Sequence, residues 1–141
     1  MKPSKACPIV VRDIGGELSV LAFLHPLAGI QLVKRTIEEP ETASSAAVRE
    51  LAEESGVTAA TISDLGIWHS GYDDQIWSFH LCRASEPLPE TWTHQCPDDG
   101  GHTFKFFWQV LTQDPSSDWH PTHAAALGHV KEALRALDRL P

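Results

Sequence analysis

The chain has 141 residues, of which 42 % are hydrophobic and 21 % are charged. This composition is typical of a globular protein, and the length suits one domain over residues 1–141 rather than two. Eleven Lys and Arg against nineteen Asp and Glu give a formal net charge of −8. The acid excess argues against a nucleic-acid polymer as partner and against an anionic membrane surface, because both are bound by clustered Lys and Arg.

Membrane and secretion signals are weak in this sequence. The longest apolar stretch, around 18–24, is far shorter than the ~20 residues that a membrane helix needs. The N-terminus reaches Arg12 and Asp13 before any hydrophobic region, so we expect no signal peptide. Three cysteines without a C-x-x-C pair indicate reduced thiols. Together these features predict a cytoplasmic protein.

Hydrophobic periodicity and turn residues predict six strands and two helices. In chain order, the predicted elements are strands over 7–14, 17–25 and 30–34, a helix over 43–55, strands over 62–70, 75–83 and 102–111, and a helix over 123–140. Gly15 and Gly16 mark a hairpin turn, and the proline-containing stretch 84–97 is expected to be irregular. This order predicts a mixed α/β domain without an internal linker.

The predicted helix over 43–55 belongs to the most acidic part of the chain. Six of the nineteen acids lie between residues 38 and 54. Because successive helical residues are rotated by about 100°, Glu50, Glu53 and Glu54 share a sector of roughly 100°. Thr42 or Ser44 can cap the start of the helix. The residues expected to face the core are Val48, Leu51, Ala52 and Ser55, and Gly56 is expected to end the helix.

Three carboxylates on one helical face repel one another, by about 0.2–0.5 kcal/mol per exposed pair. A divalent cation offsets this repulsion, and Mg²⁺ prefers carboxylate oxygens together with water and substrate phosphates. A solvated acidic face without a ligand is the alternative. Composition alone leaves both interpretations open.

The order of the residues in 49–57 favours the first interpretation. The segment Arg49-Glu50-Leu51-Ala52-Glu53-Glu54-Ser55-Gly56-Val57 resembles the core of the Nudix box, which reads Arg-Glu-aliphatic-x-Glu-Glu-x-Gly-aliphatic. The family also places a Glu eight residues before the Arg, where Glu41 stands. A Gly six residues before that Glu is replaced here by Arg35. Every defined position of the box except the first is therefore matched.

The resemblance implies an α/β/α sandwich around a mixed β-sheet and an enzyme that hydrolyses a pyrophosphate bond. Nudix enzymes use Mg²⁺ or Mn²⁺ and act on a diphosphate linked to another group, often a nucleoside. Here Glu50, Glu53 and Glu54 are the implied catalytic residues and metal ligands, and Arg49 is the implied catalytic residue that orients them. The implied partner is a small phosphorylated substrate, namely a nucleoside triphosphate or a nucleoside diphosphate-linked compound. Family members are often dimers, which leaves a homodimer open.

Further roles depend on position relative to the box. Glu41 is expected to tie the loop to the helix, through hydrogen bonds or through its charge near the helix N-terminus. The general base differs between Nudix enzymes, so a box glutamate and several loop acids remain open. These loop acids are Glu86, Glu90, Asp98 and Asp99.

Four residues are predicted to bind the substrate. Lys34 and Arg35 can contact a phosphate, and Tyr72 and Trp92, which are expected in loops, can stack on a base. An Arg at the Gly position of the box predicts either a strained backbone, which costs about 1–3 kcal/mol, or a rebuilt loop.

Two alternative functions remain beside the enzyme. A catalytically weak Nudix domain that binds a nucleotide-like ligand as a sensor is suggested by Arg35, and an acidic interaction domain without metal requires an accidental match to the box. The proline that marks the ADP-ribose subgroup a short way beyond the box is missing, since none lies between Pro40 and Pro87. His120 and His123 lack further ligands at suitable spacing, which favours a structural or surface role.

Overall fold

The computed structural model describes residues 2–97 and 101–138. The elements are, in chain order, β1 (Lys5–Ile14), β2 (Glu17–His25), β3 (Gly29–Gln31), β4 (Arg35–Thr36), α1 (Ala43–Ser55), β5 (Ala59–His69), β6 (Ile76–Ala84), β7 (Trp92–Gln95), β8 (Thr103–Val110) and α2 (Pro121–Asp138). Within these residues, no helix combines the length and the apolar character that crossing a membrane requires.

Strand β1 joins the two halves of the sheet. Its first six residues pair in parallel with β6, in a register that sets Cys7 beside Phe79. Its last four residues pair antiparallel with β2, where Val11 lies beside Val20. The strand order is β5-β6-β1-β2-β8-β7, with β3 paired to β2 and β4 paired to β1. The parallel pair among antiparallel neighbours makes the sheet mixed, as the sequence predicts.

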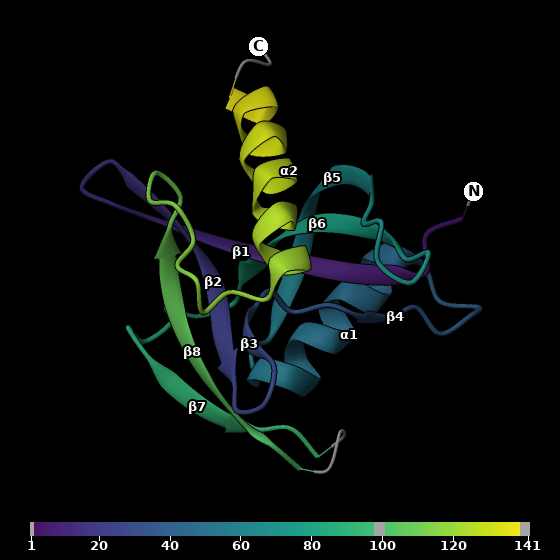
Figure 1. The fold of residues 1–141 in the computed structure, drawn as a ribbon, viewed down its shortest axis with the longest axis horizontal. Helices are drawn as coiled ribbons and strands as arrows, with labels where there is room; N and C mark the ends of the chain where they lie inside the picture. The colour runs from purple at the N-terminus through teal and green to yellow at the C-terminus, as the bar shows by residue number, and fades with distance from the viewer. Residues whose placement is uncertain (1, 98–100, 139–141) are drawn as a thin grey trace.

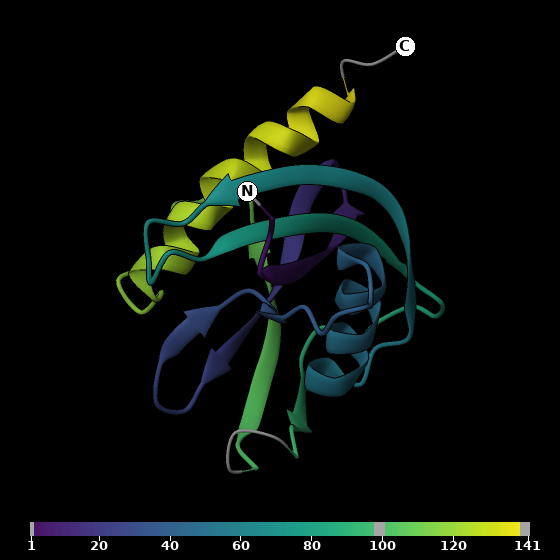
Figure 2. The ribbon, with the colours of Figure 1, turned by 90° about the vertical axis from the view of Figure 1, so that its right-hand side faces the viewer.

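The two helices lie on opposite sides of the strands (Figures 1 and 2). Alternate residues of a strand point to opposite faces. Cys7 of β1 accordingly packs in one core cluster with Leu127 and Val130 of α2, whereas Val10 packs in another with Leu51 of α1. This arrangement confirms the predicted α/β fold with a helix on each face of a mixed sheet.

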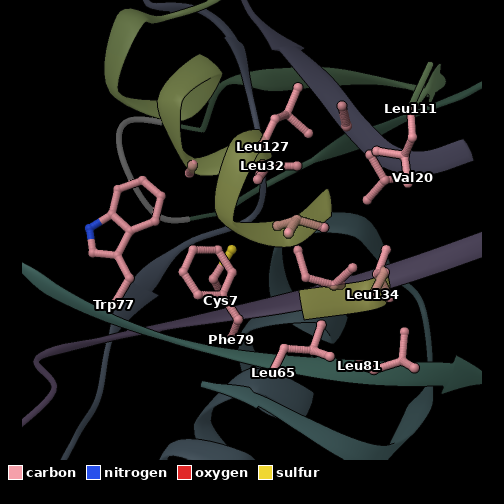
Figure 3. Packing of buried hydrophobic residues seen from close by; sticks show 14 of the residues in the cluster. Cys7, Val20, Leu32, Leu65, Trp77, Phe79, Leu81, Leu111, Leu127 and Leu134 are labelled. Atoms are coloured by element: carbon pink, nitrogen blue, oxygen red, sulfur yellow. The ribbon is translucent and has the colours of Figure 1, made fainter. Parts of the chain in front are cut away.

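Large side chains fill the core between the sheet and α2 (Figure 3). Trp77 and Phe79 of β6 lie with their ring centroids 6.0 Å apart, close to Cys7. Leu127 and Leu134 close this core from the side of α2. Burial of so much apolar surface is the main force that fixes α2 on the sheet.

Helix α1 begins and ends where the sequence predicts. Oγ1 of Thr42 accepts a hydrogen bond of 3.1 Å from the amide of Ser45, which satisfies one of the unpaired N–H groups of the first turn. Gly56 has a φ of 78°, and its N–H donates to the Ala52 carbonyl at 2.9 Å. A Cβ at this glycine would come within 3.0 Å of Nδ1 of His94. Glycine is therefore favoured here both by the left-handed backbone and by the close approach of β7.

The core-facing side of α1 differs from the prediction. Ala52 is exposed and Val48 is half-buried, whereas Glu50 and Glu54 are buried. The small side chain of Ala46 lets this part of the helix pack closely on the sheet. Glu50 and Glu54 follow Ala46 by four and eight residues, so they lie on the same face of the helix and are buried with it. The expectation that the three glutamates share one open face is wrong.

Two predictions about strands are also wrong. The single strand predicted over 30–34 is replaced by the short strands β3 and β4, which pair with different partners, β2 and β1. Residues Trp92–Gln95 form β7, although 84–97 is predicted to be irregular. Pairing with β8, a contact between segments that turn signals do not reveal, gives this segment its strand structure.

Candidate active site

Arg49 of α1 is the centre of the polar contacts in this region. Its Nε and Nη2 donate to the two carboxylate oxygens of Glu41, at 2.9 and 2.5 Å. Its Nη1 donates to Oε1 of Glu50 and, at 3.3 Å, to Oε2 of Glu53. One planar guanidinium therefore fixes three carboxylates relative to one another.

Glu41 connects the preceding loop with the helix. Its Oε1 accepts a hydrogen bond of 2.8 Å from the amide of Glu38, while both oxygens accept from Arg49. The loop is thereby tied to α1 through Glu41, as the sequence predicts. Hydrogen bonds from Arg49 and then from the Glu38 amide lower the pKa of Glu41 to about 2. The contact with Glu41 is the first cause of a raised pKa at Arg49, so both partners stay charged at neutral pH.

The three box glutamates differ in burial. Glu50 and Glu54 are 3 % and 4 % exposed, whereas the side chain of Glu53 is 41 % exposed. Burial is the first cause of the raised pKa of Glu50, and the charge of Arg49 opposes it. Carboxylates as buried as these need a cationic partner to remain ionised.

Arg35 of β4 is a second cation at the buried carboxylates. Its Nη1 lies 3.2 Å from Oε1 of Glu54, and its Nε lies 3.7 Å from Oε2 of Glu50. Its backbone is extended and pairs with Ala6 of β1. Of the two alternatives predicted for an Arg at this position, backbone strain is excluded, because any L-residue adopts a strand conformation.

The carboxylates suit a hard divalent cation in their chemistry, since Mg²⁺ and Mn²⁺ prefer oxygen ligands. Oε2 of Glu50 is buried and accepts no hydrogen bond from the described residues, so a cation has an oxygen to bind there. The side chains are nevertheless gathered around guanidinium groups. Within 2–97 and 101–138, no three acidic, His or Cys side chains are placed to hold a metal ion as they stand.

A cavity of about 420 Å³ adjoins Glu54. It is lined by Lys5, Phe23, His25, Gln31, Lys34, Arg35, Thr36, Glu54 and Phe104. The cavity thus combines three basic side chains with the half-buried ring of His25, which lies 5.1 Å from the ring centroid of Phe104. Phe104 in turn stacks on Phe23 at a centroid distance of 4.6 Å, and both phenylalanines are buried. A ligand with both phosphate and aromatic groups would find complementary partners here.

Of the residues that line this cavity, Lys34 and Arg35 are among the predicted substrate-binding residues. The sequence does not predict that Lys5, His25 and Phe104 belong to the same site. These three come from β1, β2 and β8. Gly15 and Gly16 predict the hairpin of β1 and β2, but no local motif indicates that β8, much further along the chain, pairs with β2. Which side chains meet in the cavity therefore depends on a pairing that local sequence patterns do not give.

Lys34 is a half-buried cation in the lining of this cavity. Its Nζ donates to Oε1 of Gln75 at 3.2 Å and lies 5.0 Å from the centre of the Trp77 ring. Burial and the charges of Lys5 and Arg35 lower its pKa. These basic groups therefore repel one another in the absence of an anion, which favours binding of a phosphate.

Trp92 and Tyr72, the other two predicted substrate-binding residues, lie outside the cavity beside Glu54. Trp92 belongs to β7, where its Nε1 donates to the Ser55 carbonyl at 3.0 Å and its ring stacks on Phe106 at 5.2 Å. Tyr72 is exposed between β5 and β6, with its ring edge-on to His120 at 5.9 Å. Neither residue lines the cavity beside Glu54. Substrate binding by Trp92 and Tyr72 stays a prediction.

The loop acids considered as general bases are dispersed. Glu90 forms two hydrogen bonds of 2.8 Å with Arg12, and Glu86 lines a different cavity, beside Pro87. Asp98 and Asp99 lie outside the described residues. The assignment of a general base to any of the four stays a prediction.

The buried His123 has a structural contact. Its Nδ1 accepts a hydrogen bond of 3.0 Å from the amide of Leu32, and burial lowers its pKa to about 3. It is therefore neutral and fastens α2 to the segment before β4, in agreement with the structural role predicted for it.

Residues 2–134 match a sequence model described as the NUDIX domain. The chain belongs to the NUDIX domain family. The match confirms the family and the type of enzyme, a Nudix pyrophosphohydrolase, that residues 49–57 predict. Within this NUDIX domain, Arg49 and the glutamates occupy the box positions, and Arg35 stands at the position of the missing glycine.

Solved NUDIX structures share the fold of this chain. A Nudix hydrolase from M. smegmatis, RenU, has 19 % identity and a TM-score of 0.69 over 99 % of this chain and 89 % of that one. An ADP-ribose pyrophosphatase from Streptococcus suis 89-1591 has 16 % identity and a TM-score of 0.66 over 95 % and 93 %. The NUDIX domain of Shewanella oneidensis NrtR complexed with ADP ribose has 15 % identity and a TM-score of 0.59 over 95 % and 89 %. A search of curated proteins found no match.

Proposed function

We propose that this NUDIX domain hydrolyses the pyrophosphate bond of a small nucleotide, either a nucleoside triphosphate or a nucleoside diphosphate linked to another group. The observation that carries the proposal is the position of Glu54, which belongs both to the carboxylate cluster and to the wall of the basic cavity. A phosphate in that cavity would lie next to carboxylates of the same charge. A divalent cation between the two would offset their repulsion and favour phosphate binding further.

The residues that would hold a divalent cation are Glu50, Glu53 and Glu54. Bound there, Mg²⁺ or Mn²⁺ supplies positive charge that stabilises the negative charge of the phosphates in the transition state. The donor chemistry and the buried Oε2 of Glu50 support this assignment.

The other residues bind and position. Lys5 and Lys34 line the cavity and would pair with phosphate oxygens, and the half-buried ring of His25 would offer a face for a base. Arg49 acts as a positioning residue, because it contacts the carboxylates on the helix and the loop rather than the cavity.

The cavity and two similar structures support this substrate class. The Streptococcus suis protein is described as an ADP-ribose pyrophosphatase, and the NrtR domain is complexed with ADP ribose. ADP ribose has the two features that the cavity matches, phosphate groups and an aromatic base. The proline that marks the ADP-ribose subgroup is missing from this chain, so nucleoside triphosphates belong among the candidate substrates as well.

The cellular setting belongs to the same proposal. The three cysteines are buried thiols rather than disulfides, which suits a reducing compartment such as the cytoplasm. A homodimer stays a prediction.

A second candidate is binding of a nucleotide without turnover. Arg35, which replaces the glycine of the box, contacts Glu50 and Glu54, the residues that would hold the cation. The NrtR domain with ADP ribose is an example of a NUDIX domain in complex with such a ligand.

One experiment distinguishes the two candidates. Product formation from a panel of nucleoside triphosphates, ADP ribose and related diphosphates is measured with Mg²⁺, with Mn²⁺ and with a chelator. If the domain is an enzyme, we expect metal-dependent turnover of at least one compound. This turnover should be lost in Glu53→Gln and Glu54→Gln and kept in Glu132→Gln, whose exposed carboxylate pairs with Arg135 on α2. Calorimetric binding of a compound that is never turned over would establish the second candidate and refute the first.

A further inference from the structure

Arg35 departs from the box in a way that concerns the metal site directly. We infer that Arg35 is a built-in counter-cation, which holds Glu50 and Glu54 in the metal-free protein and competes with the divalent cation for them. The inference rests on the proposed function in so far as these carboxylates are the metal ligands. Glycine, which the box has at this position, has no side chain and could not play this role.

The geometry places one guanidinium across two buried carboxylates. Nη1 of Arg35 lies 3.2 Å from Oε1 of Glu54, and Nε lies 3.7 Å from Oε2 of Glu50. The side chains of Glu50 and Glu54 are 3 % and 5 % exposed, so water screens these contacts little. Two buried carboxylates side by side would repel each other strongly without a cation between them.

The contact with Glu50 is too long to be a hydrogen bond. Arg49 donates to Oε1 of Glu50, whereas Oε2 accepts no hydrogen bond from the described residues and has Arg35 at 3.7 Å. Arg35 therefore neutralises this oxygen by charge alone, and a small cation in direct contact would satisfy it better. Oε2 of Glu50 is thus available to a metal, and the nearby charge of Arg35 opposes the binding of that metal.

Charge explains why Arg35 and a divalent cation compete for the same carboxylates. Because Arg35 lies against two of the proposed ligands, a cation bound to them has a like charge within a few ångström, which weakens its binding.

Arg35 also has space into which it can move. Its side chain is 26 % exposed and lines the cavity of about 420 Å³ beside Glu54. A guanidinium that turns away from the carboxylates would enter this cavity, next to Lys34. There a phosphate would attract it.

Direct Mn²⁺ binding to the metal-free protein tests the inference without any assay of activity. Free Mn²⁺ is measured by electron paramagnetic resonance for the wild type, Arg35→Gly, Arg35→Gln and the matched control Arg12→Gln. The control loses the same charge from another arginine–glutamate pair, outside the site. We expect both Arg35 variants to bind Mn²⁺ about tenfold more tightly than the wild type, which corresponds to about 1.4 kcal/mol, and Arg12→Gln to bind like the wild type.

A second readout is thermal stability. Without metal, the Tm of both Arg35 variants should fall below that of Arg12→Gln, because Glu50 and Glu54 lose a counter-cation. Saturating Mn²⁺ should raise the Tm of the Arg35 variants more than that of the wild type. An Arg35→Gly protein that folds with Mn²⁺ but not without metal would also support the role of Arg35 as a counter-cation.

The outcomes separate this inference from the proposed function. Wild-type binding of Mn²⁺ with no gain in either Arg35 variant overturns the role of Arg35 and leaves the metal site intact. Binding by the Arg35 variants alone supports the inference in its strongest form. Absence of binding by the wild type and by both Arg35 variants at millimolar Mn²⁺ overturns the inference and the proposed metal site together.

Discussion

Arg49 donates to both carboxylate oxygens of Glu41, which lies eight residues earlier in the chain, at 2.9 and 2.5 Å. This paired contact closes the loop before α1 onto the helix and leaves Nη1 of Arg49 to hold Glu50 and Glu53. The contact between Glu41 and Arg49 thereby helps to fix the positions of the Glu50 and Glu53 carboxylates.

Arg49→Lys should reduce kcat of the proposed reaction by about 10–100-fold, the usual cost of losing a residue that positions metal ligands. A lysine keeps the charge but cannot donate from a planar fork to Glu41, Glu50 and Glu53 at once. Steady-state kinetics measures the effect, with Arg135→Lys as control, because Arg135 makes only an exposed pair with Glu132 on α2. Equal kcat values for the two variants would show that the fork of Arg49 is dispensable.

Glu41 should make stability depend on pH in a defined range. Its pKa is about 2 in the folded protein against an ordinary value of 4.5, so the folded state binds this proton less readily than the unfolded state. The stabilisation is therefore fully present above pH about 4.5 and is lost as the pH falls through about 2. The Tm difference between the wild type and Glu41→Gln should be constant near neutral pH, shrink below 4.5 and disappear near 2.

The control for this titration is Glu132→Gln, which removes an exposed carboxylate of α2. Its Tm difference from the wild type should be small throughout, since exposed pairs contribute about 0–1 kcal/mol. A Glu41→Gln difference that persists unchanged at the acid end would contradict the depressed pKa.

Gly56→Ala should destabilise the protein by about 1–2 kcal/mol through its left-handed backbone, and further through the contact with His94. Adding His94→Ala should relieve the contact and leave the backbone cost. Gly128→Ala is the matched control, because Gly128 lies within α2 with open space around it and should gain about 1 kcal/mol. Urea unfolding measures all three, and a neutral Gly56→Ala would refute the requirement for glycine.

Trp92→Phe should lower the free energy of unfolding by about 1 kcal/mol more than Trp68→Phe does. The indole of Trp92 donates to the Ser55 carbonyl at the end of α1, whereas that of Trp68 donates to none of the described residues. Phenylalanine keeps an aromatic face against Phe106, so the difference isolates the hydrogen bond. Identical losses would mean that this hydrogen bond contributes nothing to stability.

Local signals in the sequence predict the parts of the structure that depend on local contacts. Thr42 and Gly56 mark the ends of α1, and apolar runs on either side of the Gly15-Gly16 turn mark β1 and β2. Arg49 and Glu53 are four residues apart on one helix, which is the spacing of the ion pair that they form. In each case the residues that decide the structure are within a few positions of one another.

What the sequence misses depends on contacts between distant segments. Lys5, His25 and Phe104 meet in one cavity because β1, β2 and β8 are neighbours in the sheet. The burial of Glu50 follows from close packing of α1 on β1 rather than from the pattern of the helix alone. The backbone of Arg35 is extended because β4 pairs with β1. The presence of arginine in place of glycine does not predict this pairing.

The most direct test of the central claim is the rate of pyrophosphate-bond hydrolysis in the nucleotide panel with Mn²⁺, compared between the wild type and Glu54→Gln. Glu54 is the residue that the carboxylate cluster and the basic cavity share. The account predicts turnover of at least one nucleotide by the wild type, abolished by chelation and reduced to background in Glu54→Gln. Turnover that is unchanged in the folded Glu54→Gln protein, or that persists without divalent cation, would contradict it.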